Sequence, residues 1–129
     1  MSYLHMKGIS KSFPGVRALS NVDFEAEKGE VHAIAGENGA GKSTLIKILS
    51  GAYLPDEGQI FLDGKELSIT DPHSGREQGI SVIYQELSLI PNMTVAENIF
   101  LANMPKRLGA VKWQEMRQRS HDVLQEIGF

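Results

Sequence analysis

Eight consecutive residues in this chain have the types and spacing needed to bind a polyphosphate. The run Gly36-Glu-Asn-Gly-Ala-Gly-Lys42-Ser43 fits the pattern G-x-x-x-x-G-K-[ST]. In this pattern a glycine-rich turn presents several backbone N–H groups to phosphate oxygens, with no side chains in the way. Lys42 adds a mobile positive charge for the two outer phosphates. The run therefore predicts a binding site for a nucleoside triphosphate.

The last residue of this run, Ser43, predicts a metal ion, and Thr44 directly after it predicts a further phosphate contact. Ser43 can bind a Mg²⁺ ion that bridges the β and γ phosphates, and Thr44 can hydrogen-bond an inner phosphate. A thiolate zinc site and a disulfide framework are excluded because the chain has no cysteine. The four histidines have no metal-ligand spacing: His5, His32, His73 and His121. Magnesium is therefore the metal that the sequence implies.

A phosphate-binding loop of this kind needs a strand before it and a helix after it. Val31 to Ala35 is a short run with no polar residue except His32 and predicts a strand buried on both faces. After the loop, the spacing of four apolar residues predicts a mostly buried helix, which Gly51 ends because glycine accepts a left-handed conformation. These residues are Leu45, Ile46, Ile48 and Leu49. The helix N-terminus directs positive dipole toward the phosphates.

Further strands are predicted on both sides of this unit. Apolar residues alternate with polar ones in two early segments, which predicts two strands of an antiparallel sheet. Their apolar positions are Leu4 and Met6, then Val22, Phe24 and Ala26. Gln59 to Leu62 predicts another strand, closed by a turn at Asp63-Gly64. Asp71-Pro72 predicts the start of a short helix, and Ile80 to Tyr84 a further apolar strand.

The last third of the sequence predicts two helices. Thr94 and Glu97 have the spacing of a capping box, so a helix is expected over Val95 to Leu101. A polar loop containing glycine is expected around Pro105 to Gly109. An amphipathic helix then ends the chain, with one apolar face. That face is formed by Trp113, Met116, Val123, Leu124 and Ile127.

Size and charge limit the possible functions. The chain has 129 residues and a net charge of −3, which fits one domain and argues against a nucleic-acid surface that works by counterion release. No apolar run approaches the roughly 18 residues that cross a bilayer, and the N-terminus lacks the layout of a signal peptide. We therefore expect a protein without a transmembrane segment, cytosolic unless a partner holds it at a membrane.

The loop pattern alone is compatible with a small-molecule kinase, a GTPase or a transport ATPase. A GTPase would need an Asn-Lys-x-Asp run, and the sequence has none. Four stretches of sequence distinguish among these classes. They are Lys11-Ser-Phe-Pro-Gly-Val-Arg-Ala-Leu19, Gly36 to Thr44, Tyr84-Gln-Glu-Leu87 and Asn92-Met-Thr-Val-Ala-Glu-Asn-Ile99. In order and spacing they resemble the ATP-binding-cassette (ABC) proteins that energise sugar uptake.

This resemblance implies a fold and its subdivision. The expected fold class is α/β, a P-loop NTPase with the RecA-like core of ABC proteins in truncated form. Residues 1–90 would hold an N-terminal antiparallel β-subdomain and the phosphate-loop core. Residues 91–129 would begin the helical subdomain. The whole chain would then be part of one nucleotide-binding domain.

The resemblance also implies which residues bind ATP. Phe13 matches the aromatic residue that stacks on adenine, and Val16 is its apolar neighbour. Without the resemblance, Phe13 would be interpreted as a core residue at a strand end. The phosphates would be held by Gly36, Glu37, Asn38, Gly39, Ala40, Gly41, Lys42, Ser43 and Thr44. Lys42 is also one of two expected catalytic residues.

The second expected catalytic residue is Gln85. It matches a glutamine at the end of a core strand whose amide oxygen meets Mg²⁺ and the attacking water, so Ser43 and Gln85 are the expected metal ligands. From the residues alone Gln85 would be a solvent-exposed loop residue. Glu86 follows it, and no catalytic role is assigned to it. Asp63 ends an apolar run but is expected in a hairpin turn rather than at a metal.

The resemblance further implies partners and a location. The family's ATPases sit on the cytoplasmic face of the membrane, bound to transmembrane permease subunits, and sugar importers commonly carry a second cassette. The chain contains no Leu-Ser-Gly-Gly-Gln loop and none of the family's later catalytic motifs. The 129-residue chain is therefore expected to bind Mg-ATP with near-background hydrolysis, and to be marginally stable or self-associating. The alternatives are a soluble phosphate-loop kinase or GTPase, and a non-enzymatic nucleotide-binding fragment.

Overall fold

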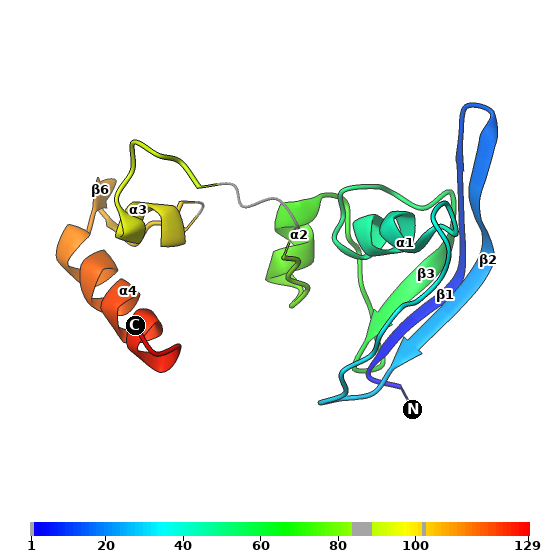
Figure 1. The fold of residues 1–129 in the computed structure, drawn as a ribbon, viewed down its shortest axis with the longest axis horizontal. Coiled ribbons are helices and arrows are strands. Elements are labelled where there is room, and N and C mark those ends of the chain that lie inside the picture. The colour runs from blue at the N-terminus through cyan, green and yellow to red at the C-terminus, as the bar shows by residue number, and fades with distance from the viewer. Residues whose placement is uncertain (1, 84–88, 102) are drawn as a thin grey trace. The chain divides into compact units, whose positions relative to one another are not determined.

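The computed structural model describes residues 2–83, 89–101 and 103–129. Contacts divide the chain into two compact units, Met1–Ile83 and Tyr84–Phe129 (Figure 1). No helix within the described ranges is long and apolar enough to cross a membrane. The candidate phosphate loop lies in the first unit.

An antiparallel sheet forms the base of the first unit. Strands β1 (Leu4–Phe13) and β2 (Val16–Ala26) pair as a long hairpin, which confirms the two strands predicted from alternation. Strand β3 (Glu57–Leu62) pairs with the other edge of β1, and β4 (Lys65–Glu66) follows it. The order across the sheet is β2-β1-β3-β4.

The turn between β3 and β4 confirms the prediction for Asp63-Gly64. Both residues have positive φ, 50° for Asp63 and 73° for Gly64. Two successive positive φ values are typical of the tight hairpin turn whose twist matches the strands on either side. The aspartate is therefore part of a turn, as expected from the glycine that follows it.

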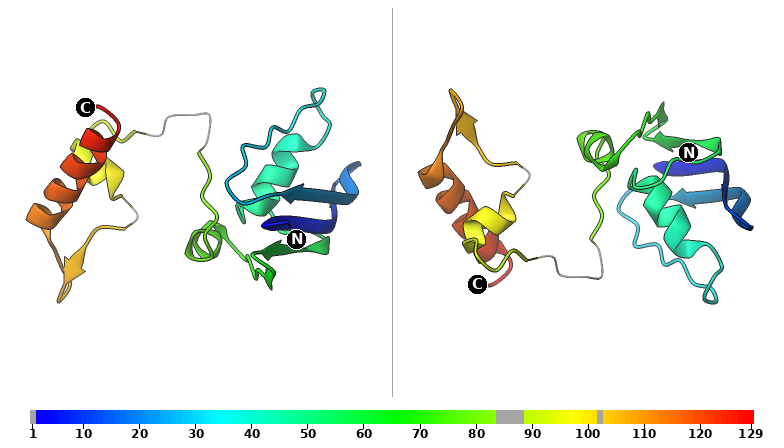
Figure 2. Two further views of the ribbon diagram at one scale, coloured as in Figure 1. Left: turned by 90° about the horizontal axis from the view of Figure 1, so that it is seen from below. Right: turned by 90° about the horizontal axis from the view of Figure 1, so that it is seen from above.

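Helix α1 (Lys42–Leu49) covers one face of this sheet (Figures 1 and 2). Leu45 and Ile48 are buried and Ile46 is partly exposed, so the helix is confirmed with a narrower buried face than predicted. Gly51 follows it with a φ of +79°. Helix and sheet share one core, formed by Met6, Ile9, Leu19, Leu45, Ile48 and Ile60.

The strand predicted over Val31–Ala35 is wrong. These residues form no strand in the described structure, and Val31 is 99% exposed, while Ile34 packs against the core. Of the further strand predicted over Ile80 to Tyr84, residues 80–83 have no strand structure, and Tyr84 lies outside the described residues. A strand requires a hydrogen-bonded neighbour, and every strand described in the first unit belongs to the β2-β1-β3-β4 sheet.

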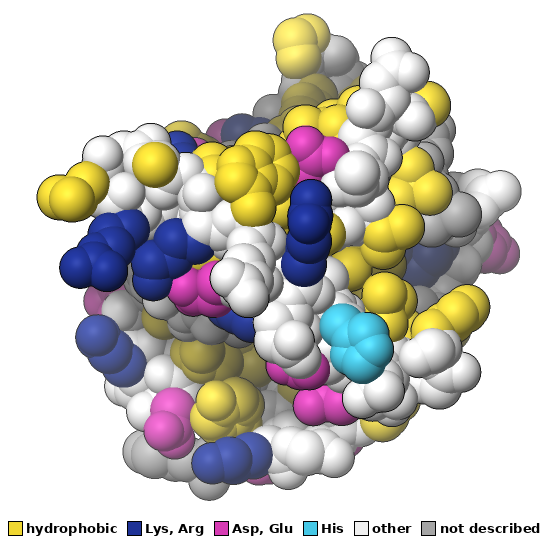
Figure 3. Space-filling view, turned by 90° about the vertical axis from the view of Figure 1, so that its left-hand side faces the viewer, with side chains coloured by type: hydrophobic (Ala, Val, Ile, Leu, Met, Phe, Trp, Pro, Cys, Tyr) yellow, Lys and Arg dark blue, Asp and Glu magenta, His cyan; other side chains and the backbone are white. Residues whose placement is uncertain are grey.

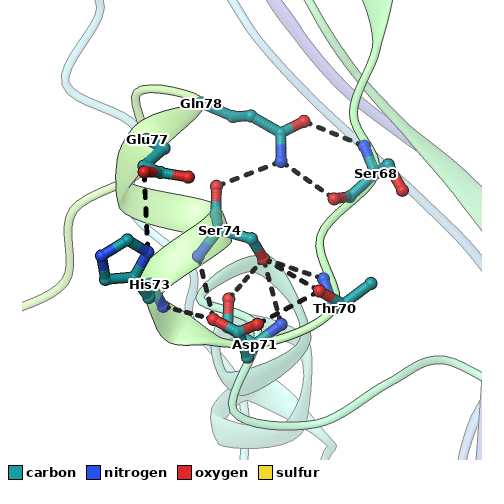
Figure 4. A network of polar contacts seen from close by, with 7 residues as sticks. All are labelled: Ser68, Thr70, Asp71, His73, Ser74, Glu77 and Gln78. Carbon is teal, nitrogen blue, oxygen red and sulfur yellow. Dashed lines mark hydrogen bonds and ion pairs between the residues drawn. The ribbon is translucent and has the colours of Figure 1, made fainter.

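Helix α2 (Pro72–Glu77) begins where Asp71-Pro72 predicted it. The Asp71 carboxylate accepts hydrogen bonds from the backbone N–H groups of His73 and Ser74 (Figure 4). Gln78 bonds both the N–H and the C=O of Ser68, which fastens the segment before the helix. The backbone bond from Ser74 is the main cause of the lowered pKa of Asp71. This polar network is a helix cap rather than a binding site.

The second unit contains helices α3 (Val95–Ile99) and α4 (Trp113–Glu126). The capping box of Thr94 and Glu97 is present, so α3 is confirmed, although it ends at Ile99 rather than at Leu101. A small hairpin of β5 (Lys106–Arg107) and β6 (Ala110–Val111) replaces the loop predicted there. The pairing of two short strands across one turn was not visible in the sequence.

The apolar face predicted for α4 is only partly buried in the second unit. Met116 is 1% exposed, and Phe100 lies beneath the guanidinium of Arg119 at 5.0 Å. Trp113 and Val123 remain about half exposed, at 48% and 45%. Hydrophobic side chains accordingly reach the surface among charged ones in the space-filling view (Figure 3).

Candidate nucleotide-binding site

The phosphate loop lies directly on strand β2. Gly41 immediately precedes α1 and has a φ of +87°. A Cβ atom at this position would lie 2.7 Å from the carbonyl oxygen of Ala18 and 2.7 Å from Cδ2 of Leu19. Only glycine fits, because both the backbone conformation and the space exclude a side chain. The pattern's second glycine is thus explained by the contact between the loop and the sheet.

The Lys42 side chain folds back across the loop. Its Nζ donates to the carbonyl oxygens of Gly36 and Glu37, each at 2.6 Å. Gly36 lies close beneath the side chain, since a Cβ there would be 3.7 Å from Cδ of Lys42. The ammonium is therefore held by neutral carbonyl groups inside the turn. An incoming phosphate would meet a cation that is already in place.

The N-terminus of α1 suits an anion. The first turn, Lys42 to Leu45, contains no acidic residue, and no side chain in the described structure caps it. The first N–H groups of a helix have no partner within the helix and carry partial positive charge. Ser43 is exposed in this turn and Thr44 is half-buried. The glycine cradle, the lysine and the helix end together fit a chain of phosphate groups.

Phe13 and Val16 lie opposite each other at the closed end of the β1-β2 hairpin. Gly15 between them has a φ of +79°, as the tight connection requires. Val16 is 62% exposed, whereas Phe13 is half-buried and packs against Tyr53, with ring centroids 5.3 Å apart and planes at 67°. The expected base-binding residues therefore share one hairpin end.

The register of the sheet connects this hairpin end to the phosphate loop. Lys11 pairs with Leu19, the residue whose side chain touches Gly41. Phe13 is two residues beyond Lys11, about 7 Å along the strand. The structure thus brings the loop and the two hairpin residues into one unit. Gln85 and Glu86 lie outside the described residues.

Two residues near this site had no role in the predictions from sequence. Tyr53 contacts Phe13, and Asp56 binds both the Lys11 ammonium and the backbone N–H of Ser12, each at 2.7 Å. The lysine and then the backbone bond hold the pKa of Asp56 below its ordinary value. Each contact spans at least 40 residues of sequence, so no local pattern signals it.

The second unit has an apolar groove near α3, lined by residues that precede the helix and by the helix itself. Leu89 and Val95 are strongly exposed there, at 70% and 62%. Asn98 and Ile90 both line the groove, and the Asn98 side chain hydrogen-bonds both the N–H and the C=O of Ile90. This bonding fixes the segment before α3 against the helix.

Sequence comparison identifies relatives over nearly the whole chain. Residues 19–129 match the family model described as ABC transporter. The ribose import ATP-binding protein RbsA 1 of Rubrobacter xylanophilus is 54% identical over 126 residues, which are 98% of this chain and 25% of that protein. The arabinose import ATP-binding protein AraG of Vibrio parahaemolyticus is 50% identical over 127 residues, again 98% and 25%. The chain spans about a quarter of the length of these curated relatives.

Solved structures with the same fold are also ATP-binding cassettes. A nucleotide-free cassette from an ABC transporter has a TM-score of 0.72 and 30% identity, covering 92% of this chain and 46% of that one. A second cassette has a TM-score of 0.80 and 29% identity, covering 97% and 53%. These matches confirm the predicted cassette fold, a mixed α/β fold with an N-terminal antiparallel sheet. The chain belongs to the ABC transporter family.

Proposed function

We propose that this chain is part of the ATP-binding subunit of a sugar importer, in which binding and hydrolysis of Mg-ATP drive uptake. The observation that carries the proposal is the phosphate loop, with Lys42 held across it and Gly41 fitted against β2. The relatives named for ribose and arabinose import support the sugar-importer branch. The family match disfavours a soluble kinase or GTPase.

Each residue of the loop has a part in binding the triphosphate. Lys42 exchanges its two carbonyl partners for oxygens of the β and γ phosphates. The N–H groups of the loop and of the first turn of α1 bind the remaining oxygens. Ser43 would hold Mg²⁺, which would neutralise charge on the outer phosphates, and Thr44 would bond an inner phosphate. The loop residues Glu37, Asn38, Gly39 and Ala40 contribute their backbone.

The base binds at the hairpin end. Phe13 stacks on adenine and Val16 adds an apolar contact, which holds the base without demanding hydrogen bonds. Gln85 is proposed as the second metal ligand and as the residue that orients the attacking water, a role that rests on the resemblance alone. Lys42 and Gln85 are thus the proposed catalytic residues.

Partners follow from the same proposal. The subunit would bind transmembrane permease subunits and work with a second cassette, peripherally at the cytoplasmic face of the membrane. The permease would choose the sugar, because none of the residues placed in this site recognises one. Residues 1–129 alone would bind Mg-ATP with near-background hydrolysis, since the water-activating glutamate and the signature loop of ABC proteins are not in this stretch.

A chimeric importer tests this proposal. Residues 1–129 would replace the matching quarter of a ribose import ATP-binding protein in cells that lack the original, and uptake of labelled ribose would be measured. We expect the chimera to restore uptake, a Lys65→Ala version to match it, and a Lys42→Ala version to fail. Equal uptake by the Lys42→Ala chimera would contradict the proposal. Lys65 is a suitable control because it is exposed in β4.

A further inference from the structure

The segment that follows α1 is hydrogen-bonded to the end of strand β1. The backbone N–H of Asp56 donates to the carbonyl oxygen of Ser10 at 2.9 Å. Its carboxylate accepts from the N–H of Ser12 and from Nζ of Lys11, each at 2.7 Å. Three consecutive residues of β1 are therefore fixed by one residue. The next residue along β1 is Phe13.

Tyr53, three residues before Asp56, connects α1 to Phe13. Its backbone N–H donates to the carbonyl oxygen of Lys47, in the last turn of α1, at 3.1 Å. The Lys47 ammonium lies 5.1 Å from the centroid of the Tyr53 ring. The same ring meets Phe13 at 5.3 Å in a T-shaped arrangement, the geometry that aromatic pairs prefer. Tyr53 is thus bound to the helix on one side and to Phe13 on the other.

A continuous set of contacts therefore joins the phosphate loop to the hairpin end. Helix α1 begins at Lys42, inside the loop, and spans about 12 Å at 1.5 Å per residue. Its last turn holds Tyr53, and Tyr53 packs on Phe13. A helix is stiff over this length, so Tyr53 links the Phe13 ring to the loop by a second path, beside the one through the β1-β2 register. Ring and loop must be correctly spaced if one nucleotide is to contact both.

We propose that Tyr53 is a positioning residue for nucleotide binding: it holds the Phe13 ring at the spacing from the phosphate loop that lets the ring stack on the base. This inference rests on the proposed function, because it requires that Phe13 contacts the base. Tyr53 affects the contribution of the base to affinity and leaves phosphate binding unchanged. Lys47 assists by holding the Tyr53 ring from the side of α1.

The test compares ATP with inorganic tripolyphosphate, which has no base, by calorimetric titration of the chain in Mg²⁺. Aromatic pairs contribute about 0.5–1.5 kcal/mol, and about 1.4 kcal/mol corresponds to a tenfold change in affinity. Tyr53→Leu is therefore expected to weaken ATP binding by about 2- to 12-fold and to leave tripolyphosphate binding unchanged. Tyr53→Phe keeps the ring and should bind both ligands as the unaltered chain does. Lys47→Met, a milder change, should weaken ATP alone, by less than Tyr53→Leu.

The double variant completes the test. Phe13→Ala should weaken ATP selectively, and adding Tyr53→Leu to it should cause no further loss, because the two residues act as one unit. Selective loss in Phe13→Ala with none in Tyr53→Leu would overturn the positioning role alone. Equal losses for ATP and tripolyphosphate in Tyr53→Leu would assign Tyr53 to general stability and also overturn it. An unchanged ATP affinity in Phe13→Ala would overturn the proposed base contact, and the positioning role with it.

Discussion

The Nζ atom of Lys42 lies 2.6 Å from the carbonyl oxygen of Gly36, six residues earlier in the chain. Nζ donates a second bond of the same length, 2.6 Å, to the carbonyl oxygen of Glu37. Both partners are neutral, so a charged phosphate can replace them without breaking an ion pair. The loop therefore keeps its cation inside the turn that would surround a phosphate.

Substitution of Gly41 should damage nucleotide binding. An alanine there would place Cβ 2.7 Å from the Ala18 carbonyl oxygen, at a φ of +87° that costs about 1–2 kcal/mol for a non-glycine residue. If the strain lowers the binding free energy of ATP by this amount, ATP affinity falls about 5- to 30-fold in calorimetric titration. Gly29→Ala is the control, because its φ is +76° and its Cβ would meet open space. Equal ATP affinities in the two variants would show that the loop tolerates the displacement.

Substitution of Gly51 should reduce the free energy of unfolding more than any backbone effect alone. A Cβ there would lie 2.5 Å from the carbonyl oxygen of Asp71, at a φ of +79°. The matched change Gly64→Ala, in an open turn with a φ of +73°, should cost only the left-handed penalty of about 1–2 kcal/mol. Urea unfolding followed by circular dichroism measures both. A loss in Gly51→Ala no greater than in Gly64→Ala would refute the close packing of α1's end on α2's start.

Asp56 should make the stability of the first unit depend on pH. Its bonds to Lys11 and Ser12 lower its pKa in the folded chain below the ordinary value of 3.8. Its stabilising effect is therefore complete above pH 3.8 and is lost as pH falls through the lower folded value. We expect Asp56→Asn to be less stable than the unaltered chain at pH 7, with the difference shrinking toward pH 2. A difference in stability between the two chains that stays constant over this range would contradict the account. Added salt should weaken the contribution of Lys11, because the ion pair between Lys11 and Asp56 is partly exposed.

Local chemistry explains which elements could be predicted from the sequence. The phosphate loop, both capping sites at Asp71 and Thr94, and the Asp63-Gly64 turn depend on residues a few positions apart. Each was therefore visible as a short pattern. The hairpin around Leu108-Gly109 was missed because leucine, at a φ of 51°, is not a residue that signals such a turn.

Long-range pairing explains what could not be predicted. The apolar run Val31–Ala35 has the composition of a buried strand, but composition does not supply the neighbouring strand that its backbone groups need. The contacts of Tyr53 with Phe13 and of Asp56 with Lys11 join residues at least 40 positions apart. The sequence suggested which residues meet the nucleotide. It could not suggest which residues hold them in place, because those contacts join distant parts of the chain.

Binding of Mg-ATP by the 129-residue chain tests the central claim most directly. The unaltered chain, Lys42→Ala and the exposed control Lys65→Ala would be titrated with ATP by calorimetry, in Mg²⁺ and again in excess chelator. The account predicts saturable, magnesium-dependent binding by the unaltered chain and by Lys65→Ala, and its loss in Lys42→Ala. Undiminished binding by Lys42→Ala, or binding by the unaltered chain that ignores magnesium, would contradict it.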